Sequence, residues 1–353
     1  MTTETNAFRY LSRDDVVRAV ATIDPVAVVA ETLRLHSENR VVLTEEAYLP
    51  WRSPGRAANQ CLAMPGAVDF DDGYTVGLKT INSSSRNTAN GLPRAQGLTL
   101  LLDNETARPR AVMEAAYITA LRTAAVTAIA AQTLGREKMS NMGLIGCGAQ
   151  AMAHLTLLSD TVPTLAEVRL FDVDAARAEK FRAQAAALRP ALRIEVMPTA
   201  RECVTGVDLV VPVTTVTKGY IPWDWLTPGT LVSNVSLDDL LPDVVHRCDL
   251  LVLDDWDLVS GDNRRLLGRM YRAGDLLSPS AIVNDHAGSG PSTSARKVDA
   301  TLGEVVAGAH RGRCADTDIV VCNAFGMAIL DIAVAHRVAT AAERAGIGQL
   351  LAL

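Results

Sequence analysis

The sequence lacks the features of secreted and membrane-bound proteins. Its six cysteines form no C-x-x-C pair, which argues against a disulfide framework or a zinc knuckle and is typical of the reducing cytoplasm. No apolar run reaches the roughly eighteen residues of a membrane span. The first residues also lack the basic and apolar segments of a signal peptide. We therefore expect a cytoplasmic protein that does not bind a membrane.

The sequence also lacks an excess of positive charge and any metal-binding pattern. Its net charge is −6 at pH 7, so it has no electrostatic footprint for nucleic acid. The six histidines are isolated, without the spacing of metal ligands or of a group that activates a nucleophile. We therefore expect neither a nucleic-acid partner nor a bound metal.

The first part of the sequence predicts helices followed by an antiparallel sheet. Helical patterns cover residues 14–22 and 25–37. From Arg40 onward, short strand-like runs alternate with Pro, Gly and Asn turns, as in an antiparallel sheet. These runs are residues 41–43, 60–64, 75–81, 97–103 and 111–114. An alanine-rich helix is expected from about Ile118 to Leu134.

From residue 141 onward, strands and helices alternate, which predicts a parallel sheet with helices on both faces. The expected strands are residues 142–145, 166–173, 193–196, 207–214, 230–235, 250–253 and 319–322. A final helix over 324–345 is placed to return to the first part of the chain. We therefore predict the α/β class, with a Rossmann doubly wound parallel-sheet domain over 126–319. It interrupts a discontinuous α+β domain made of residues 1–125 and 320–353.

A glycine-rich turn opens the predicted parallel sheet. Gly146-Cys-Gly-Ala-Gln-Ala151 fits G-x-G-x-x-A and stands between a buried strand and a helical pattern. Such a turn brings backbone close to a pyrophosphate at a helix N-terminus, which makes Gly146, Gly148, Ala149 and Gln150 candidate cofactor contacts.

The strand that follows ends near Asp172, about 24 residues beyond Gly148, where an acidic residue usually holds the ribose hydroxyls. Its carboxylate would repel a 2′-phosphate, so NAD is favoured over NADP. Thr214, Thr215 and Ser236 follow later strands of the sheet and are further candidate contacts for the ribose or nicotinamide.

Several polar side chains could carry chemistry. Lys79 lies in an apolar strand pattern, so it either reaches water or faces a cleft. Arg122 interrupts a small-residue helix and suits either capture of a carboxylate or a surface salt bridge. Arg52 is a possible second anion contact, and Met64 suits a pocket wall. Asp238, with Asp239 beside it, follows a strand end, where it suits acid–base chemistry or a helix cap.

Motifs over nearly the whole chain resemble the ornithine cyclodeaminase/mu-crystallin family. They are Met64-Pro65, Gly77-Leu-Lys79, Leu121-Arg-Thr-Ala-Ala125, Gly146-Cys-Gly-Ala-Gln150 and Gly326-Met-Ala-Ile-Leu-Asp331. The resemblance implies an NAD(P)-binding Rossmann domain and a discontinuous domain that forms a homodimer. It implies that Lys79 and Arg122 belong to the substrate site, with Arg122 holding the α-carboxylate of a small amino acid. It also implies that Arg52, or Arg56 in its place, is the other carboxylate contact and that Asp238 is the catalytic aspartate.

Further stretches are most similar to one branch of that family. They include Ile81-Asn-Ser-Ser-Ser-Arg86, Val112-Met-Glu-Ala-Ala-Tyr117 and Asn323-Ala-Phe-Gly-Met327. Enzymes of this siderophore-pathway branch oxidise N-(2-amino-2-carboxyethyl)-L-glutamate with NAD, giving 2-oxoglutarate and L-2,3-diaminopropionate. The branch is expected to carry Arg-Asp where this chain has Asp238-Asp239. Ornithine cyclodeamination, imine reduction or amino-acid dehydrogenation, and non-enzymatic nucleotide binding as in mu-crystallin therefore stay open as alternatives.

Overall fold

The computed structural model describes residues 6–236, 238–281 and 295–353. The chain separates into two compact units. Unit 1 comprises residues 1–122 and 326–353, and unit 2 comprises residues 123–325.

Unit 1 is built on one sheet, which has eight strands within the described residues. Their order is β18-β1-β7-β6-β5-β4-β2, with β3 paired to β4. The strands are β1 (Ala7–Leu11), β2 (Val41–Leu43), β3 (Ala47–Arg52), β4 (Ala58–Phe70), β5 (Gly73–Ser84), β6 (Ala95–Leu102), β7 (Pro109–Glu114) and β18 (Gln349–Ala352). All pairs are antiparallel, as predicted, except β1 with β7, which are parallel.

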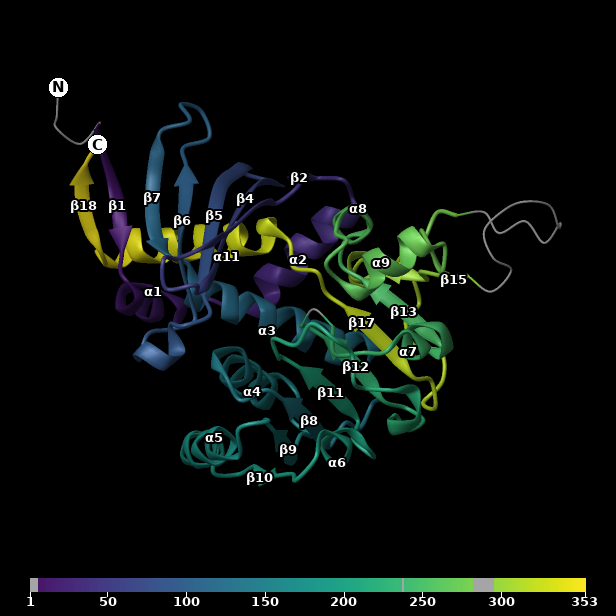
Figure 1. The fold of residues 1–353 in the computed structure, drawn as a ribbon. Helices are drawn as coiled ribbons and strands as arrows, with labels where there is room; N and C mark the ends of the chain where they lie inside the picture. The colour runs from purple at the N-terminus through teal and green to yellow at the C-terminus, as the bar shows by residue number, and fades with distance from the viewer. Residues whose placement is uncertain (1–5, 237, 282–294) are drawn as a thin grey trace. The chain divides into compact units, whose positions relative to one another are not determined.

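Two of the helices of unit 1 begin at side-chain caps. The helices of this unit are α1 (Arg13–Val20), α2 (Pro25–Ser37), the short η2 (Thr88–Asn90), the start of α3 (Ala115–Leu134) and α11 (Ala328–Ala345). Ser12 and Asp15 form a capping box at α1, and Asp24 caps α2 ahead of Pro25. Helix α11 packs across β4, β5 and β6 and is buried along most of its length (Figure 1).

Unit 2 contains a parallel sheet, again with eight strands among the described residues, in the order β10-β9-β8-β11-β12-β17-β13-β16. The strands are β8 (Asn141–Ile145), β9 (Glu167–Phe171), β10 (Arg193–Val196), β11 (Leu209–Pro212), β12 (Leu231–Asn234), β13 (Leu250–Leu253), β16 (Ala300–Thr301) and β17 (Val320–Asn323). The strand order reverses at β8, which creates a topological switch point beside its carboxyl end. The predicted fold class, a Rossmann parallel sheet joined to a discontinuous α+β part, is confirmed.

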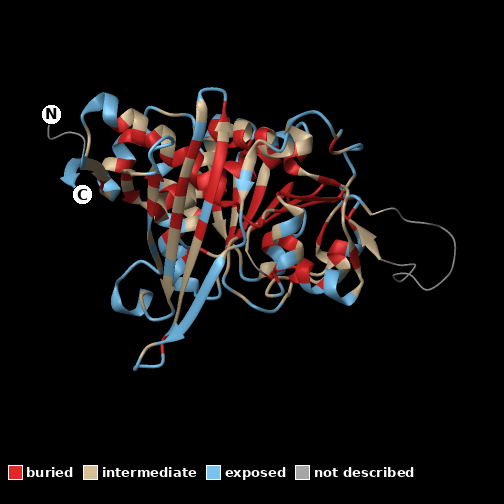
Figure 2. Ribbon diagram, turned by 90° about the horizontal axis from the view of Figure 1, so that it is seen from above, coloured by how far each residue is buried: buried red, intermediate tan, exposed pale blue. Residues whose placement is uncertain are grey.

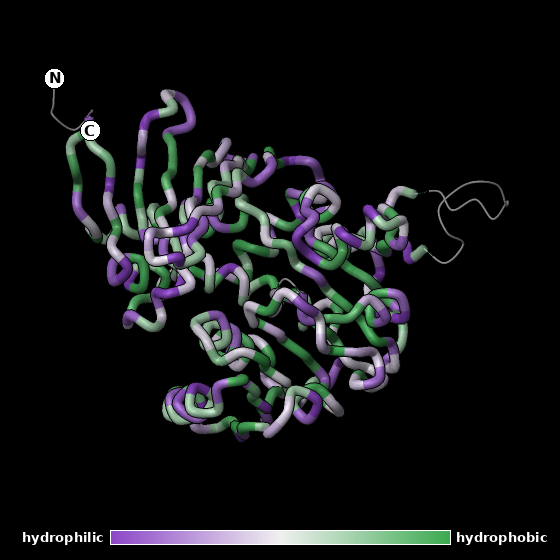
Figure 3. The backbone as a smooth tube through the Cα atoms, in the orientation of Figure 1, coloured by the Kyte–Doolittle hydropathy of each residue, from purple (hydrophilic) through white to green (hydrophobic). Residues whose placement is uncertain are grey.

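The central strands of unit 2 form its core. Strands β11, β12, β13 and β17 are buried at every position, and in Figure 3 the strands of this sheet are largely green. Figure 2 shows the same concentration of buried residues in red. The remaining elements are α4 (Ala149–Thr161), α5 (Ala175–Leu188), α6 (Ala200–Val204), η3 (Trp223–Trp225), α7 (Pro242–Arg247), α8 (Trp256–Gly261), α9 (Leu266–Ala273), β14 (Leu276–Leu277), β15 (Arg296–Lys297) and α10 (Leu302–Val306). None of the helices described is long and apolar enough to cross a membrane.

Candidate active site

The glycine turn of unit 2 lies at the switch point, between β8 and α4. Gly146 has a φ of +92°, and a Cβ there would lie 3.0 Å from the Val213 carbonyl oxygen. Gly148 caps α4 without a side-chain hydrogen bond, and a Cβ added to it would meet nothing within 4 Å. The turn thus combines a backbone that needs glycine with open space before the N–H groups of a helix. That combination suits a pyrophosphate.

Two further side chains fit a dinucleotide at this turn. Asp172, at the end of β9, accepts hydrogen bonds from the backbone N–H groups of Cys147 and Asp174, each at 2.9 Å. It therefore fixes the turn and places a carboxylate beside it. The Oε1 atom of Gln150 is buried and has no hydrogen-bond partner within the described part of the chain. A buried acceptor beside an open turn is consistent with a polar ligand there.

The hydroxyl groups that follow β11 and β12 converge on Asp239. Its carboxylate accepts hydrogen bonds from Thr214 at 2.7 Å and from the Tyr220 phenol at 2.8 Å, and also from Ser236. Burial raises the pKa of Asp239, the three hydroxyls oppose this shift, and the neighbouring Asp238 charge adds to it. Thr214 and Ser236, predicted as cofactor contacts, thus have hydroxyls directed at a carboxylate, whereas Thr215 is exposed.

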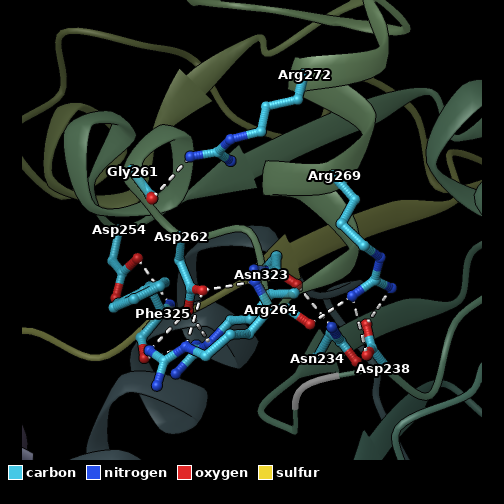
Figure 4. A network of polar contacts seen from close by, with 11 residues as sticks. Asn234, Asp238, Asp254, Gly261, Asp262, Arg264, Arg269, Arg272, Asn323 and Phe325 are labelled. Atoms are coloured by element: carbon cyan, nitrogen blue, oxygen red, sulfur yellow. Dashed lines mark hydrogen bonds and ion pairs between the residues drawn. The ribbon is translucent and has the colours of Figure 1, made fainter. Parts of the chain in front are cut away.

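Asp238 has a different environment from Asp239. It is 3% exposed, and its two oxygens accept hydrogen bonds from the terminal nitrogens of Arg269 at 2.8 and 3.2 Å (Figure 4). The predicted catalytic aspartate is therefore held in a bidentate ion pair. Nearby, at the carboxyl ends of the paired strands β12 and β17, the side-chain amide of Asn234 donates a hydrogen bond to Oδ1 of Asn323 at 2.6 Å.

Unit 1 contains a buried cluster of charged groups. The Lys79 ammonium on β5 is 2.9 Å from Oδ2 of Asp331, and Nε of Arg122 is 3.0 Å from the same oxygen. The other oxygen of Asp331 accepts a hydrogen bond from the Thr119 hydroxyl at 2.7 Å. Lys79 is 1% exposed, Arg122 is 7% exposed and Asp331 is fully buried. Two predicted substrate residues therefore meet at one aspartate.

The ion pairs of this cluster join one carboxylate to two basic side chains. Burial lowers the pKa of Lys79, Asp331 opposes this shift and Arg122 reinforces it. Burial also opposes ionisation of Asp331, but Arg122 and Lys79 outweigh it, so the pKa of Asp331 is lowered. The Glu46 carboxylate also acts on Lys79 and opposes the lowering of its pKa. The guanidinium of Arg122 suits a ligand carboxylate.

The strand register places two further residues beside Lys79. Met64 on β4 and Thr99 on β6 are its direct cross-strand partners, and both are buried. Arg52 lies apart from this cluster, on β3, where it is exposed and borders a shallow hollow with Trp51 and Arg94. The structure therefore brings Lys79, Arg122 and Met64 together and leaves Arg52 outside the group.

Sequence reasoning missed Asp331 as a member of this cluster. The signal was present, because an aspartate inside the apolar run Ala328-Ile-Leu-Asp-Ile-Ala333 must be paired if that helix is buried. Its partners, however, are 252 residues away at Lys79 and 212 residues away at Thr119. Local pattern alone could not identify them.

A glycine turn at the switch point of a parallel sheet defines a dinucleotide-binding α/β protein. A model of the ornithine cyclodeaminase/mu-crystallin family matches residues 10–346. The chain is 30% identical to the N-((2S)-2-amino-2-carboxyethyl)-L-glutamate dehydrogenase of Staphylococcus aureus, covering 98% of each chain. Its sequence is 38% identical to that of the protein in the crystal structure of CmnK, and the two structures superpose with a TM-score of 0.88 over 99% of both chains. An archaeal alanine dehydrogenase dimer with bound NAD is 27% identical, with a TM-score of 0.81 over 98% of this chain and 99% of that one.

The chain belongs to the ornithine cyclodeaminase/mu-crystallin family, as its motifs predicted.

Proposed function

We propose that this NAD-dependent oxidoreductase, which acts on a CH–NH bond of an amino acid, oxidises N-(2-amino-2-carboxyethyl)-L-glutamate. The products would be 2-oxoglutarate and L-2,3-diaminopropionate. The observation that carries the proposal is the buried Lys79–Asp331–Arg122 cluster, in which a lysine and an arginine share one aspartate, an arrangement that suits an amino-acid carboxylate. The S. aureus relative, similar over 98% of both chains, supports the choice of substrate.

Unit 2 would bind NAD and unit 1 the amino acid. The backbone of Gly146, Gly148 and Ala149 would face the pyrophosphate, with Gln150 beside it. Asp172 would hold the ribose hydroxyls and disfavour a 2′-phosphate. Thr214, Thr215 and Ser236 would lie toward the nicotinamide. NAD supplies the hydride acceptor when it is bound.

In unit 1, Arg122 would hold the substrate α-carboxylate and so orient the Cα–H bond that is broken. Lys79 would share that carboxylate or the amine, and Met64 would form the wall beside it. Arg52 is proposed as a contact for a second carboxylate. Its exposed position on β3 predicts a weaker contribution than that of the buried Arg122.

The reaction needs a base, because a protonated secondary amine has no lone pair to stabilise the forming iminium. The base takes the amine proton, and the Cα hydrogen then leaves as hydride to the acceptor, which gives the iminium. The base passes that first proton to solvent before it takes another from the water that adds to the iminium carbon, and this second proton goes to the departing amine nitrogen. The water oxygen becomes the keto oxygen of 2-oxoglutarate, and the C–N bond breaks to release the diamine. Lys79 and Asp238 are the groups predicted from the sequence. Asp239, with its raised pKa, is a third suited group that the structure adds.

The direct test incubates purified protein with NAD and the adduct while NADH and 2-oxoglutarate are followed together. We expect the two products in a one-to-one ratio and expect neither from Lys79→Met. Ornithine cyclodeamination would instead give proline and ammonia without net NADH. Absence of turnover with any amino or imino acid would favour a nucleotide-binding protein.

We also infer that the protein is a homodimer, because the similar archaeal alanine dehydrogenase is a dimer. Strand β3 supports this inference because it is exposed at every position and carries Tyr48, Leu49 and Trp51. A second copy that covered this strand would remove apolar surface from water.

A further inference from the structure

We propose that Arg269 is a positioning residue that neutralises Asp238 and so leaves Asp239 as the carboxylate that exchanges protons during the reaction. This inference rests on the proposed function, in which a carboxylate after β12 serves as the base. It assigns different tasks to two adjacent aspartates that the sequence alone does not distinguish.

The contacts of Asp238 suit a fixed charge. Both of its oxygens accept hydrogen bonds from one guanidinium, at 2.8 and 3.2 Å, and its side chain is almost fully buried (Figure 4). A bidentate pair of this kind holds the carboxylate in one orientation beside one positive charge.

Arg269 is itself held in place. It extends from α9 and also donates to the carbonyl oxygen of Arg264 (Figure 4). Arg264 is fixed in turn, because its backbone N–H and its guanidinium both bind Asp262, at 2.7 and 2.9 Å. The position of the Arg269 charge is therefore set by the turn that precedes α9, although its side chain is 45% exposed.

The contacts of Asp239 suit proton exchange. Its partners are the neutral hydroxyls of Thr214, Tyr220 and Ser236, which can donate to the ionised form and rearrange around the protonated one. The titratable groups that face it are the Tyr220 phenol and the Asp238 carboxylate. Without Arg269, the charge of Asp238 would act on Asp239 uncompensated and would disfavour its ionisation.

The test measures the pH titration of the Asp239 carboxyl in four variants by infrared difference spectroscopy. The carboxyl band of Asp239 is identified as the band that a reference substitution, Asp239→Asn, abolishes. In Arg269→Met we expect the midpoint to rise by about one pH unit or more, as an uncompensated neighbouring charge requires. Arg269→Lys keeps the charge and should shift the midpoint less. The double variant Arg269→Met/Asp238→Asn removes both charges and should restore it.

Arg272→Met is the matched control. It removes a guanidinium from the same helix, but one that, among the described residues, binds the backbone carbonyls of Gly268 and Gly261, so the midpoint should stay unchanged. An unmoved midpoint in Arg269→Met, or no restoration in the double variant, would overturn the proposal. If Arg269→Met does not fold, Arg269→Gln, which also removes the charge, takes its place with the same expected shift.

The pH profile of kcat/KM is the second measurement. Its acidic limb should move with the carboxyl midpoint in each variant. A protein that oxidises no amino acid would contradict the proposed function, whereas the spectroscopic midpoint decides the role of Arg269 independently of turnover.

Discussion

Asp331 compensates two buried cations at once, so its removal should be costly. In Asp331→Asn, Lys79 and Arg122 would stay buried with no ionised partner in this cluster. We expect a loss of about 3–5 kcal/mol in the free energy of unfolding, the range found when one partner of a buried ion pair is removed. Urea denaturation measures this loss. Asp71→Asn, which removes a 92% exposed carboxylate paired with Arg40, is the control and should change stability little.

Gly326 leaves room for the guanidinium of Arg122. It has a φ of +95°, and a Cβ on it would lie 2.9 Å from Nη1 of Arg122. We expect Gly326→Ala to displace the guanidinium and to raise KM for the amino acid about tenfold or more, with a smaller effect on kcat. Gly346→Ala tests backbone strain alone, because Gly346 also has a positive φ but its Cβ would meet nothing within 4 Å. Equal kinetic effects of the two variants would contradict this role for Gly326.

The sequence identified candidate site residues where a charged residue stands within an otherwise apolar or small-residue pattern. Lys79 in an apolar strand and Arg122 in a small-residue helix are such residues, and both proved to be buried. The sequence could not show that Asp331 pairs with them, or that Asp238 pairs with Arg269, because each pairing joins distant segments. The roles of these residues in binding and catalysis remain predictions.

At the scale of elements, the glycine turn between β8 and α4 can be tested without disturbing the fold. Gly148 and Gly261 both have ordinary φ values and open space where a Cβ would lie, but only Gly148 belongs to the turn. We expect Gly148→Val to lower NAD affinity at least about tenfold, because the side chain would occupy the space before the helix N-terminus. Gly261→Val should leave affinity unchanged. Titration of NADH fluorescence measures both, and unfolding midpoints near that of the wild type would show that the fold is kept.

A buried hydrogen-bonded chain ties α4 to α3 and β12. Nδ1 of His154 lies 2.8 Å from the Gln150 carbonyl oxygen, so that nitrogen carries the proton. Nε2 then accepts from the Thr127 hydroxyl at 3.1 Å, and Thr127 contacts the Ser233 hydroxyl at 2.9 Å. Burial lowers the pKa of His154 to about 4. This series of hydrogen bonds therefore requires a neutral His154 imidazole.

This pKa makes stability depend on pH. Between pH 6.5 and about 4 the unfolded His154 binds a proton that the folded one does not, so stability falls as pH falls through that window. The expected loss is about 3 kcal/mol. Urea denaturation at several pH values should show a smaller loss for His154→Gln, while replacing the exposed His246 should not alter the dependence. His336, whose pKa is also lowered to about 4, contributes equally in all three proteins.

Helices and strands whose apolar residues recur at a regular spacing were predicted well. Strands that form only by pairing with a strand distant in the sequence were not predicted. The helix over 118–134 and the seven predicted strands of unit 2 lie near their expected positions because their side chains are buried in regular patterns, whereas the two-residue strands β14, β15 and β16 were not predicted. Strands β1 and β18 were missed. The four residues of β18 are all exposed, and it exists through its pairing with β1 rather than through a pattern of its own. The same reason explains why β3, exposed throughout, was not predicted.

At the scale of the whole molecule, the inferred homodimer predicts a particle of twice the 37.6 kDa chain mass in light scattering coupled to gel filtration. Leu49→Asp, on the exposed strand β3, should shift the mass toward one chain if a second copy covers this strand. Val173→Asp is the control, because Val173 is 91% exposed in unit 2 and its replacement should leave the mass unchanged. A single-chain mass for the wild type at micromolar concentration would contradict the dimer.

The two ends of the chain meet in one sheet, where β18 pairs with β1. On the ribosome, Lys79 and Arg122 emerge long before Asp331 and the last strand. Unit 2, which is continuous in sequence, can close while synthesis is still under way, whereas unit 1 must wait for its final segment. A nascent chain that stops early therefore keeps an open sheet with uncompensated cations. That state is open to proteolysis, so chains that lack α11 and β18 should accumulate less as a folded protein.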